Sequence, residues 1–425
     1  MTVDDRFGPQ LEEARRNRLR GTVSVSEIVT EPVSDWATDF SHVDPQWAAD
    51  PYPIQDDLRR RCPIAHTERF GGVWLPTRYE DVAAIAYDTE RFSSRAIVVS
   101  NVKPPRELAP VGGVPPISSD PPFHHDARKL LLPAFTKTAV ARREASTRAL
   151  CHELIDGLEG REVVDAAREY AQYIPMRVIA DMLGFPSEDA GRFQRFVENA
   201  LESVNEPTET RMEHIAELSS YLVEQIHDHL AHPRDDLTTY LLGAELNGAK
   251  LDPVHVVGTM TLLLIAGIDT TWSAIGASLW HLAKTPADRE RLVAEPALLP
   301  TAMEEFLRAY APVTMARLVK NDMHWNGVDM KADDWVLLSF PAANRDPAHF
   351  DHPADIRIDR EVNRHAAFGL GIHRCVGSHL ARMELRTALD VWLQRIPAFT
   401  LADPGAVTWA ASQVRGPRTL PLRIG

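Results

Sequence analysis

The sequence has 425 residues, of which 44% are hydrophobic and 25% are charged, the balance of a soluble globular protein with a large core. Its formal net charge of −14 argues against binding nucleic acid, for which a basic surface is expected. The N-terminus lacks the apolar segment of a signal peptide, and the longest nearly uncharged stretch, residues 256–268, is shorter than the roughly 20 residues that span a bilayer. We therefore expect a cytoplasmic protein with no membrane segment.

Residues 1–45 are mixed in charge and show no strong periodicity, so we expect a loosely held leader there and one domain over residues 46–425. The first part of that domain predicts a helix, a short pair of strands around Gly71–Gly72 and a second helix. Residues 97–123 are rich in proline and glycine. A long irregular loop of this kind inside a compact domain is often functional.

The apolar spacing between residues 124 and 310 is helical almost throughout, with breaks at clusters of turn-forming residues. Short strands follow residue 312, and Asn326–Gly327 suits the turn of a hairpin. No internal repeat is visible, and no linker divides the chain. The sequence therefore predicts a mainly helical single domain with a minor β part.

The chain has three cysteines, Cys62, Cys151 and Cys375, which lie far apart in the sequence. Their number and spacing fit neither a disulfide framework nor a zinc site. Cys62 and Cys151 are interpreted as small buried apolar residues. Cys375 stands in a different context, because glycines crowd it on both sides and a helical pattern begins directly after it.

Glycines let the backbone around Cys375 turn tightly and approach a large flat group. The amide groups at the start of the following helix favour the thiolate over the thiol. A thiolate on an open surface suits either a nucleophile or a soft metal. A nucleophile needs a base within hydrogen-bond reach, and His373 is two residues away. A haem iron needs only the thiolate, with cationic side chains from elsewhere for the two propionates.

Residues 368–377 read FGLGIHRCVG. This segment resembles the cysteine-ligand loop of the cytochrome P450 superfamily, whose pattern is Phe-Gly-x-Gly-x-His-x-Cys-x-Gly. The residues at the fixed positions of this haem-binding loop are Phe368, Gly369, Gly371, His373, Cys375 and Gly377. The resemblance implies the cytochrome P450 fold in a single haem domain, with haem b as cofactor and Cys375 as the axial ligand of its iron.

Residues 265–271 read IAGIDTT and lie inside a helical pattern over residues 254–284. Thr270 and Thr271 suit a helix interior poorly, because both are β-branched and compete for backbone carbonyls. The segment resembles the oxygen-activation motif of the P450 family. The resemblance implies that Asp269 and Thr270 supply protons during dioxygen activation, and that Ala266 and Gly267 leave room for dioxygen.

Glu305 and Arg308 lie three residues apart, and therefore on one face of a predicted helix. Alone, such a pair is usually a solvated surface pair of little energetic value. Between the other motifs it resembles the Glu-x-x-Arg pair of the P450 family, with Arg360 as a third member. The resemblance implies a structural role, in which the three residues hold the loop that carries Cys375.

Four basic residues complete the expected haem site. His124 and Arg128 lie four apart at the start of a predicted helix, and Arg317 ends a predicted strand. The resemblance assigns these three and His373 to the haem propionates, a task that suits charge-assisted hydrogen bonds to carboxylates. His125 is the alternative to His124 if the helix is rotated.

The resemblance also implies the reaction. A soluble bacterial-type haem-thiolate monooxygenase inserts one atom of dioxygen into an organic substrate, with electrons from NAD(P)H through a separate reductase and a ferredoxin or flavodoxin. Alternatives are a peroxide-driven enzyme of the same family and, in a different class, a haem-based gas sensor. The Asp269–Thr270 pair argues against both, and we expect a monomer.

Position in the family also suggests which residues contact the substrate. The candidates are largely apolar and favour a medium-sized apolar molecule, although Arg95 could hold a carboxylate. They are Ile97, Val98, Leu263, Val313, Thr314, Met315, Gln413 and Val414.

A cluster of basic residues is expected beside the Cys375 loop. Its members are Arg374, Arg382 and Arg386, with Arg128 and Lys129 on a helix that the family places nearby. On a chain with a net charge of −14, such a cluster suggests a docking surface for an acidic ferredoxin.

Overall fold

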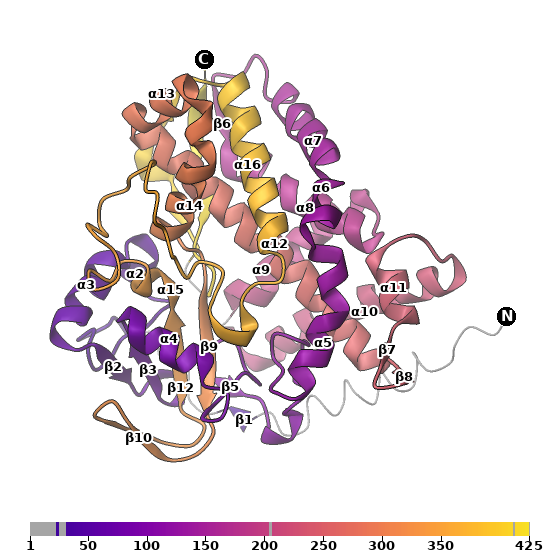
Figure 1. Ribbon diagram of the computed structural model, residues 1–425, viewed down its shortest axis with the longest axis vertical. Coiled ribbons are helices and arrows are strands. Elements are labelled where there is room, and N and C mark those ends of the chain that lie inside the picture. Colours follow the sequence, from indigo (N-terminus) through magenta and orange to yellow (C-terminus); the bar gives the residue numbers. More distant parts are fainter. Residues whose placement is uncertain (1–22, 25–30, 204–205, 411–412, 425) are drawn as a thin grey trace.

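The computed structural model describes residues 23–24, 31–203, 206–410 and 413–424 (Figure 1). Residues 1–22 and 25–30 of the predicted leader lie outside the described residues. The remainder of that segment is packed against the protein: Phe40 is fully buried, and Asp39 receives a hydrogen bond from the Arg69 Nε at 2.7 Å. Residues 31–45 are therefore held more firmly than we expected from their composition.

The predicted mainly helical single domain with a minor β part is confirmed. Figure 1 shows the helices forming the upper and right-hand body, with the largest sheet and the N-terminal helices at the lower left. The main helices are α2 (Pro45–Ala49), α3 (Tyr52–Arg61), α4 (Tyr79–Tyr87), α5 (Phe123–Leu131), α6 (Lys137–Ala141), α7 (Glu144–Asp156), α8 (Tyr173–Leu183), α9 (Ala190–Glu202), α10 (Thr208–Ala231), α11 (Leu237–Gly243), α12 (Pro253–Lys284), α13 (Pro286–Ala294), α14 (Leu299–Ala309), α15 (Phe340–Ala343) and α16 (Ser378–Arg395).

The largest sheet has the strand order β2-β3-β12-β9-β4. Its strands are β2 (Ile64–Thr67), β3 (Val73–Pro76), β4 (Phe92–Ser93), β9 (Thr314–Val319) and β12 (Trp335–Ser339). β3 and β12 run parallel, and the other neighbours run antiparallel. Every residue of β9 and β12 is buried, because both faces of these central strands are covered. The predicted strand pair around Gly71–Gly72 is β2 and β3.

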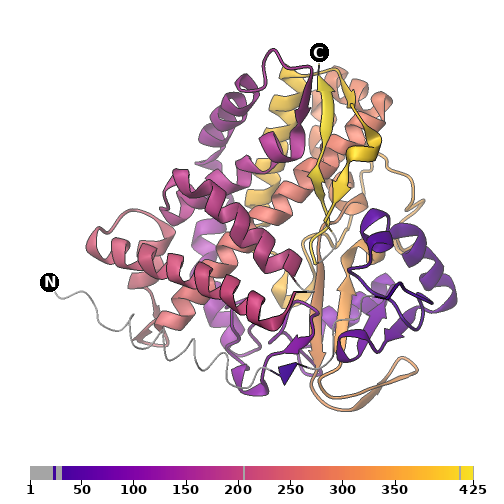
Figure 2. The ribbon, with the colours of Figure 1, turned by 180° about the vertical axis from the view of Figure 1, so that it is seen from behind.

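Smaller sheets complete the fold, and Figure 2 shows the C-terminal strands, in yellow, beside the helices. These strands are β1 (Val23–Ser24) with β5 (Val102–Lys103), β7 (Glu245–Leu246) with β8 (Ala249–Lys250), β10 (Met323–Trp325) with β11 (Val328–Met330), β14 (Thr408–Trp409) with β15 (Pro417–Thr419), and β6 (Val163–Asp165) with β16 (Pro421–Ile424) and β13 (Phe399–Leu401). The predicted hairpin at Asn326–Gly327 joins β10 to β11, with positive φ angles of 45° and 85° at its two central residues.

Helix α12 runs through the core against α8 and α16. It starts at a well-formed cap, where Asp252 accepts a hydrogen bond from the Val254 N–H and Pro253 takes the first helical position. Among the described residues it is the one helix long and apolar enough to cross a membrane by length and composition. The apolar part of α12 is longer than residues 256–268, the nearly uncharged stretch counted from the sequence, because it continues beyond the single acidic residue Asp269. Most of its residues are buried inside the protein, as expected for a core helix.

The predicted core pair is part of a buried charge cluster. Glu305 of α14 is fully buried and accepts hydrogen bonds at 2.8 Å from both Nε and Nη2 of Arg308. Arg360 Nε and the Arg357 N–H donate to the same carboxylate at 2.9 Å. Burial raises the pKa of Glu305, but these donors outweigh burial and hold it below its ordinary value. The cluster thereby ties α14 to residues 344–363, which lead into the Cys375 loop.

Glu305→Gln should destabilise the protein by about 3–5 kcal/mol, because it leaves two buried arginines without their counter-charge. Denaturant unfolding of the purified protein measures the change. Arg291→Gln is the matched control, since its pair with Asp359, at 2.9 Å, is exposed on both sides and should contribute little to stability. Equal losses in the two variants would contradict the structural role of Glu305.

Candidate functional site

The Cys375 loop lies between a short 3-10 turn, Gly371–His373, and the start of α16. The Cys375 N–H donates to the Phe368 carbonyl at 2.7 Å, which closes the loop on itself. Gly369 and Gly371 have φ angles of +71° and +68°, a region that favours glycine. Of the three cysteines, Cys375 is exposed, Cys62 is partly buried and Cys151 is fully buried. The loop therefore presents one thiol.

Gly371 is required by a close contact. A Cβ at this position would lie 2.3 Å from the carbonyl oxygen of Ala86, near the end of α4. The Gly377 N–H on the other side donates to the sulfur of Cys375. The loop is thus seated against α4 at one end and supports the sulfur at the other.

The Cys375 side chain reaches the surface, yet the protein atoms packed around it raise its pKa by desolvation. The Gly377 N–H and the arginines Arg128, Arg374 and Arg382 act in the opposite direction and lower it. The backbone amide at the helix start therefore favours the thiolate, as expected, but does not by itself outweigh desolvation. A bound metal ion would supply further stabilisation, because a coordinating thiol is deprotonated outright.

Two histidines with unsatisfied ring nitrogens lie side by side near the loop. His124 of α5 is buried, and its ring centroid lies 4.4 Å from that of His373 in an edge-to-face arrangement. Within the described residues, neither ring nitrogen of His124 and not the Nε2 of His373 has a hydrogen-bond partner. Burial lowers the pKa of His124 to about 4 and that of His373 well below its usual value. His125 is exposed, which argues against it as the alternative to His124.

The two predicted arginines act on the same region. Arg317 of β9 is buried, and burial lowers its pKa to about 10. Its charge and that of Arg128 both lower the pKa of His373, so the four basic groups lie close together. Arg128 Nη2 donates to the Arg374 carbonyl at 2.6 Å, which ties α5 to the loop. This set of groups fits a haem. The thiol suits the iron, and the unpaired histidine nitrogens and the two arginines suit the two propionate carboxylates.

Helix α12 carries an accessible stripe on an otherwise buried surface. Leu262, Ala266 and Thr270 are spaced four apart, and Ala266 is exposed although it lies in mid-helix. Thr270 Oγ1 donates to the Ala266 carbonyl at 2.9 Å, and its oxygen can still accept a hydrogen bond. The neighbouring Asp269 and Ile268 are buried. The stripe presents the hydroxyl of the predicted proton-supplying pair.

Gly267 faces the neighbouring helix α8. A Cβ at this position would lie 2.5 Å from Cδ1 of Ile179, so a side chain here would force the end of Ile179 to shift. Glycine thus allows the close packing of α12 on α8, and its role in leaving room for dioxygen stays a prediction. Ala266, on the accessible stripe, remains the predicted small residue.

Asp269 has a partner that sequence reasoning missed. Arg418 of β15 lies with Nη2 at 2.9 Å from Asp269 Oδ1 and donates a hydrogen bond to Oδ2 at 3.1 Å. The two residues are 149 positions apart in the chain. Because no local spacing links them, only the folded structure could identify the pair.

The structure brings the predicted substrate-contacting segments together. Val313 forms a β-bridge with Val414, and the Thr314 N–H donates to the Gln413 carbonyl at 2.9 Å. Gln413 Nε2 donates to the Ile97 carbonyl at 2.9 Å, which connects the third segment. These segments come from three distant parts of the chain and meet at one place.

The remaining candidates differ in their surroundings. Val98 is partly buried, Met315 lies 3.1 Å by its sulfur from the Gln413 side chain, and Leu263 belongs to the same apolar cluster as Val414. Arg95 is buried and paired with Asp333. It is therefore engaged by the protein's own carboxylate, which argues against a role as a substrate anchor.

Most of the basic cluster is already paired. Arg382 donates to Glu304 at 2.6 and 2.8 Å and stacks over the Phe368 ring, and Arg386 donates to Glu144 at 2.8 Å. Arg374 is exposed, and its side chain has no ion pair within the described residues. Of the expected cluster, Arg374 is therefore the free cation of the loop.

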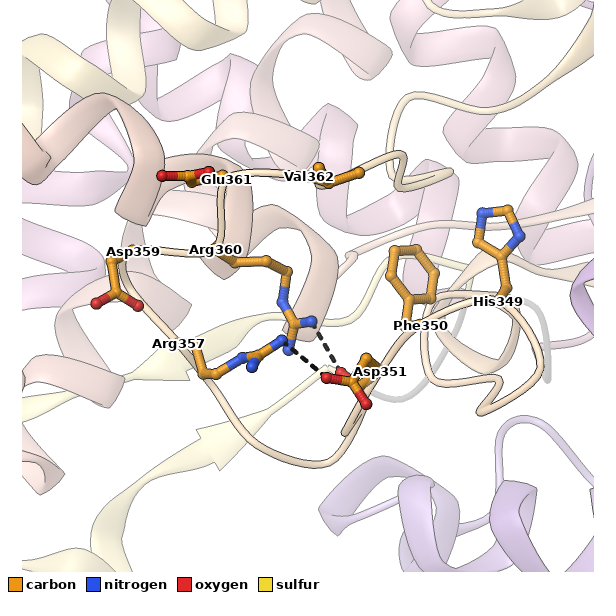
Figure 3. A pocket seen from close by; sticks show the side chains of 8 residues that line it. All are labelled: His349, Phe350, Asp351, Arg357, Asp359, Arg360, Glu361 and Val362. Atoms are coloured by element: carbon orange, nitrogen blue, oxygen red, sulfur yellow. Dashed lines mark hydrogen bonds and ion pairs between the residues drawn. The ribbon is translucent and has the colours of Figure 1, made fainter.

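A surface pocket of about 460 Å³ lies in the segment that precedes the loop (Figure 3). Arg360 turns inward there and donates to the Asp351 carbonyl at 2.9 Å. Its lining residues are His349, Phe350, Asp351, Arg357, Asp359, Arg360, Glu361 and Val362. Apart from Arg360, which belongs to the Glu305 cluster, none of them is a predicted site residue.

These features define a haem-thiolate protein of mainly helical fold, and comparisons with known proteins give its family. The model of the family Cytochrome P450 matches residues 168–398. Polyketide biosynthesis cytochrome P450 PksS of Bacillus subtilis (strain 168) is 31% identical over 88% of this chain and 96% of its own length. Mycinamicin IV hydroxylase/epoxidase of Micromonospora griseorubida is 35% identical over 82% of this chain and 89% of its own.

A solved structure agrees with these relatives. Bacillus megaterium CYP109E1 in complex with testosterone has a TM-score of 0.79 and 30% identity, and the match covers 88% of this chain and 97% of that chain. The chain belongs to the cytochrome P450 family. It is a P450 monooxygenase of bacterial type, and its cofactor is thiolate-ligated haem.

Gly371→Ala should destabilise the protein by more than the roughly 1–3 kcal/mol that a non-glycine residue costs in the left-handed region, because the new methyl group also meets Ala86. Gly327→Ala is the control, since Gly327 also has a positive φ but no atom within 4 Å of the new Cβ. Denaturant unfolding and haem retention are measured on both. The close contact is refuted if the two variants lose the same stability.

Proposed function

We propose that Cys375 is the axial ligand of the haem iron and that the enzyme inserts one atom of dioxygen into a medium-sized, largely apolar organic substrate. The observation that carries this proposal is the single exposed thiol, held in a glycine-dependent loop beside four basic side chains. A thiolate-bound haem supplies electron density that favours cleavage of the dioxygen bond. In the described residues, no group of three or more histidine, cysteine or acidic side chains offers a competing metal site.

The four basic residues hold the cofactor. His124, His373, Arg128 and Arg317 bind the propionates, and the unpaired nitrogens of the two histidines support this assignment. Phe368, Gly369 and Gly377 form the loop wall around the sulfur. Buried neutral histidines donate through one nitrogen, and the arginines supply the positive charge.

Asp269 and Thr270 deliver protons. Thr270 lies on the accessible stripe of α12, and its hydroxyl donates to the Ala266 carbonyl, so its oxygen can accept a hydrogen bond from water or from Asp269 while the hydroxyl passes a proton on. Ala266 leaves space beside it. Asp269 lies one residue away and is fully buried.

The substrate is expected to be apolar because the assembled contact segments are. Hydrocarbon surface comes from Ile97, Val313 and Val414. The polar side chains of Gln413 and Thr314 donate hydrogen bonds to backbone carbonyls of the neighbouring segments. The names of relatives, which include a polyketide biosynthesis enzyme and a testosterone complex, support an apolar substrate of this kind. A panel of steroids, polyketides and fatty acids, screened by the change in the haem absorption spectrum on binding, tests this class.

Electrons come from NAD(P)H through a separate reductase and a ferredoxin or flavodoxin that docks beside the Cys375 loop. Arg374 supplies a free positive charge there, and the backbone of Tyr87, a residue that is 65% exposed, lies next to Gly371. We further propose that one haem domain covers residues 46–425 and takes in residues 31–45, and that the enzyme is a cytoplasmic monomer.

Cys375→Ala should abolish the red-shifted absorption of the reduced carbon-monoxide complex, because that spectrum reports a thiolate ligand. Cys62→Ser is the control and should keep it, since Cys62 packs at the edge of an apolar cluster and its sulfur donates to the Ile64 carbonyl at 3.5 Å, away from the Cys375 loop in sequence. The spectrum is recorded on the reduced, carbon-monoxide-treated proteins. A Cys375→Ala protein with the normal spectrum would disprove the assignment.

Thr270→Ala should bind haem normally but divert a several-fold larger share of reducing equivalents to hydrogen peroxide, because the hydroxyl that passes protons is gone. Thr270→Ser keeps the hydroxyl and should stay close to wild type. Product and peroxide formed per NADH consumed are measured with any substrate that is turned over. If Thr270→Ala remains as well coupled as Thr270→Ser, protons arrive by another route.

Arg374→Glu should slow reduction by an acidic ferredoxin several-fold without changing substrate affinity. The effect should fade as salt rises, because the screening length falls from about 30 Å at 0.01 M to about 8 Å at 0.15 M. Stopped-flow reduction across a salt series measures it. Arg60→Glu, the same change at an exposed arginine of α3, is the control. Identical rates for the two variants at low salt would rule out docking at the loop.

A further inference from the structure

Asp269 is held by one residue from the C-terminal part of the chain. It is fully buried on α12, and Arg418 of β15 makes its ion pair. Arg418 Nη2 donates a hydrogen bond to Oδ2 at 3.1 Å and lies 2.9 Å from Oδ1, and within the described residues no further donor reaches the buried Oδ1. Both carboxylate oxygens therefore depend on one guanidinium nitrogen.

The same arginine also binds a second carboxylate. Arg418 Nε donates to Glu202 at 2.5 Å, and Glu202 is the last residue of α9. The guanidinium is fixed between them, because it stacks 4.3 Å above the Trp272 ring and donates to Ser273 Oγ at 3.3 Å. Arg168 anchors the backbone by donating to the Arg418 carbonyl at 3.3 Å. Arg418 thus bridges two helices through two acids.

The charges at this place do not balance. One guanidinium faces Asp269 and Glu202, and Glu198, one turn earlier on α9, adds a further negative charge. Burial raises the pKa of Asp269, Arg418 lowers it, and Glu202 and Glu198 raise it again. Because burial and the two glutamates outweigh the shared arginine, Asp269 favours its protonated form more than an ordinary aspartate does.

We propose that Arg418 is a positioning residue for Asp269, and that Glu202 competes for it, so that the end of α9 sets how firmly Asp269 is held and when it carries a proton. This inference rests on the proposed role of Asp269 in proton delivery. When Glu202 is engaged, Arg418 is shared and Asp269 keeps its proton more readily. When Glu202 moves away, Arg418 serves Asp269 alone and the carboxylate is favoured.

The experiment titrates Asp269 directly in the ferric holoenzyme, without turnover. Its carboxylic-acid stretching band is isolated by subtracting the infrared spectrum of Asp269→Asn at each pH. The subtraction is needed because burial also raises the pKa of Glu384 to about 8. Glu202→Gln should move the Asp269 midpoint to lower pH, and Arg418→Gln should move it to higher pH. Arg418→Lys, which restores the charge, should return part of the shift.

Glu198→Gln is the matched control, because it removes the same charge from the same helix without an ion pair to Arg418. It should shift the midpoint in the direction of Glu202→Gln but less far. The proposal is overturned if Glu202→Gln shifts the midpoint no further than Glu198→Gln. Glu202 is at the helix end and partly exposed, so this comparison decides the matter even if Arg418→Gln does not fold.

A second measurement separates this inference from the proposed function. The share of NADH diverted to hydrogen peroxide is followed against pH in wild type and in Glu202→Gln. A peroxide profile that moves with the infrared midpoint supports both. A midpoint that moves while the peroxide profile stays fixed refutes proton delivery by Asp269 and leaves the shared arginine established.

Discussion

The haem-binding loop depends on one buried carboxylate. Glu305 gathers two arginines and a backbone N–H, and Arg308 in turn donates to the carbonyls of Asn344, Pro353 and Asp355. The segment that these bonds fix has little regular secondary structure of its own. The side-chain oxygen of Asn344 accepts a hydrogen bond from the Ala366 N–H at 2.7 Å, and Ala366 lies directly before the Cys375 loop. The charge pair on α14 therefore fixes the irregular segment, and that segment in turn fixes the Cys375 loop.

Its neighbour Glu304 secures the other side of the loop. It binds Arg382 and His365, and although burial raises its pKa, these partners bring the pKa down to about 2. Arg382 also covers the Phe368 ring at 4.3 Å. Two adjacent acids on α14 therefore bind the segments before and after the loop. These contacts explain how a glycine-rich stretch holds the sulfur of Cys375 in a fixed place.

Sequence reasoning succeeded where local spacing carries the information. The Cys375 loop, the Glu305–Arg308 pair and the Asn326–Gly327 hairpin are each set by residues a few positions apart, and the structure has all three. It failed for partners that only folding brings together, such as Asp333 for Arg95 and Glu304 for Arg382. The packing of Gly267 against Ile179 was missed for the same reason, because the two residues are remote in the chain.

The largest sheet joins residues 64–93 to residues 314–339. β3 pairs in parallel with β12, so that Val73 lies opposite Trp335, while the long helices lie between them in the sequence. Contacts of such long range are slow to form, because a large loop must close before they stabilise anything. During synthesis, the edge of the β2–β3 hairpin therefore stays unpaired until β12 has been made. An unpaired apolar edge is a site where other chains can aggregate. We expect closure of this sheet, and not helix formation, to limit the rate at which the enzyme folds.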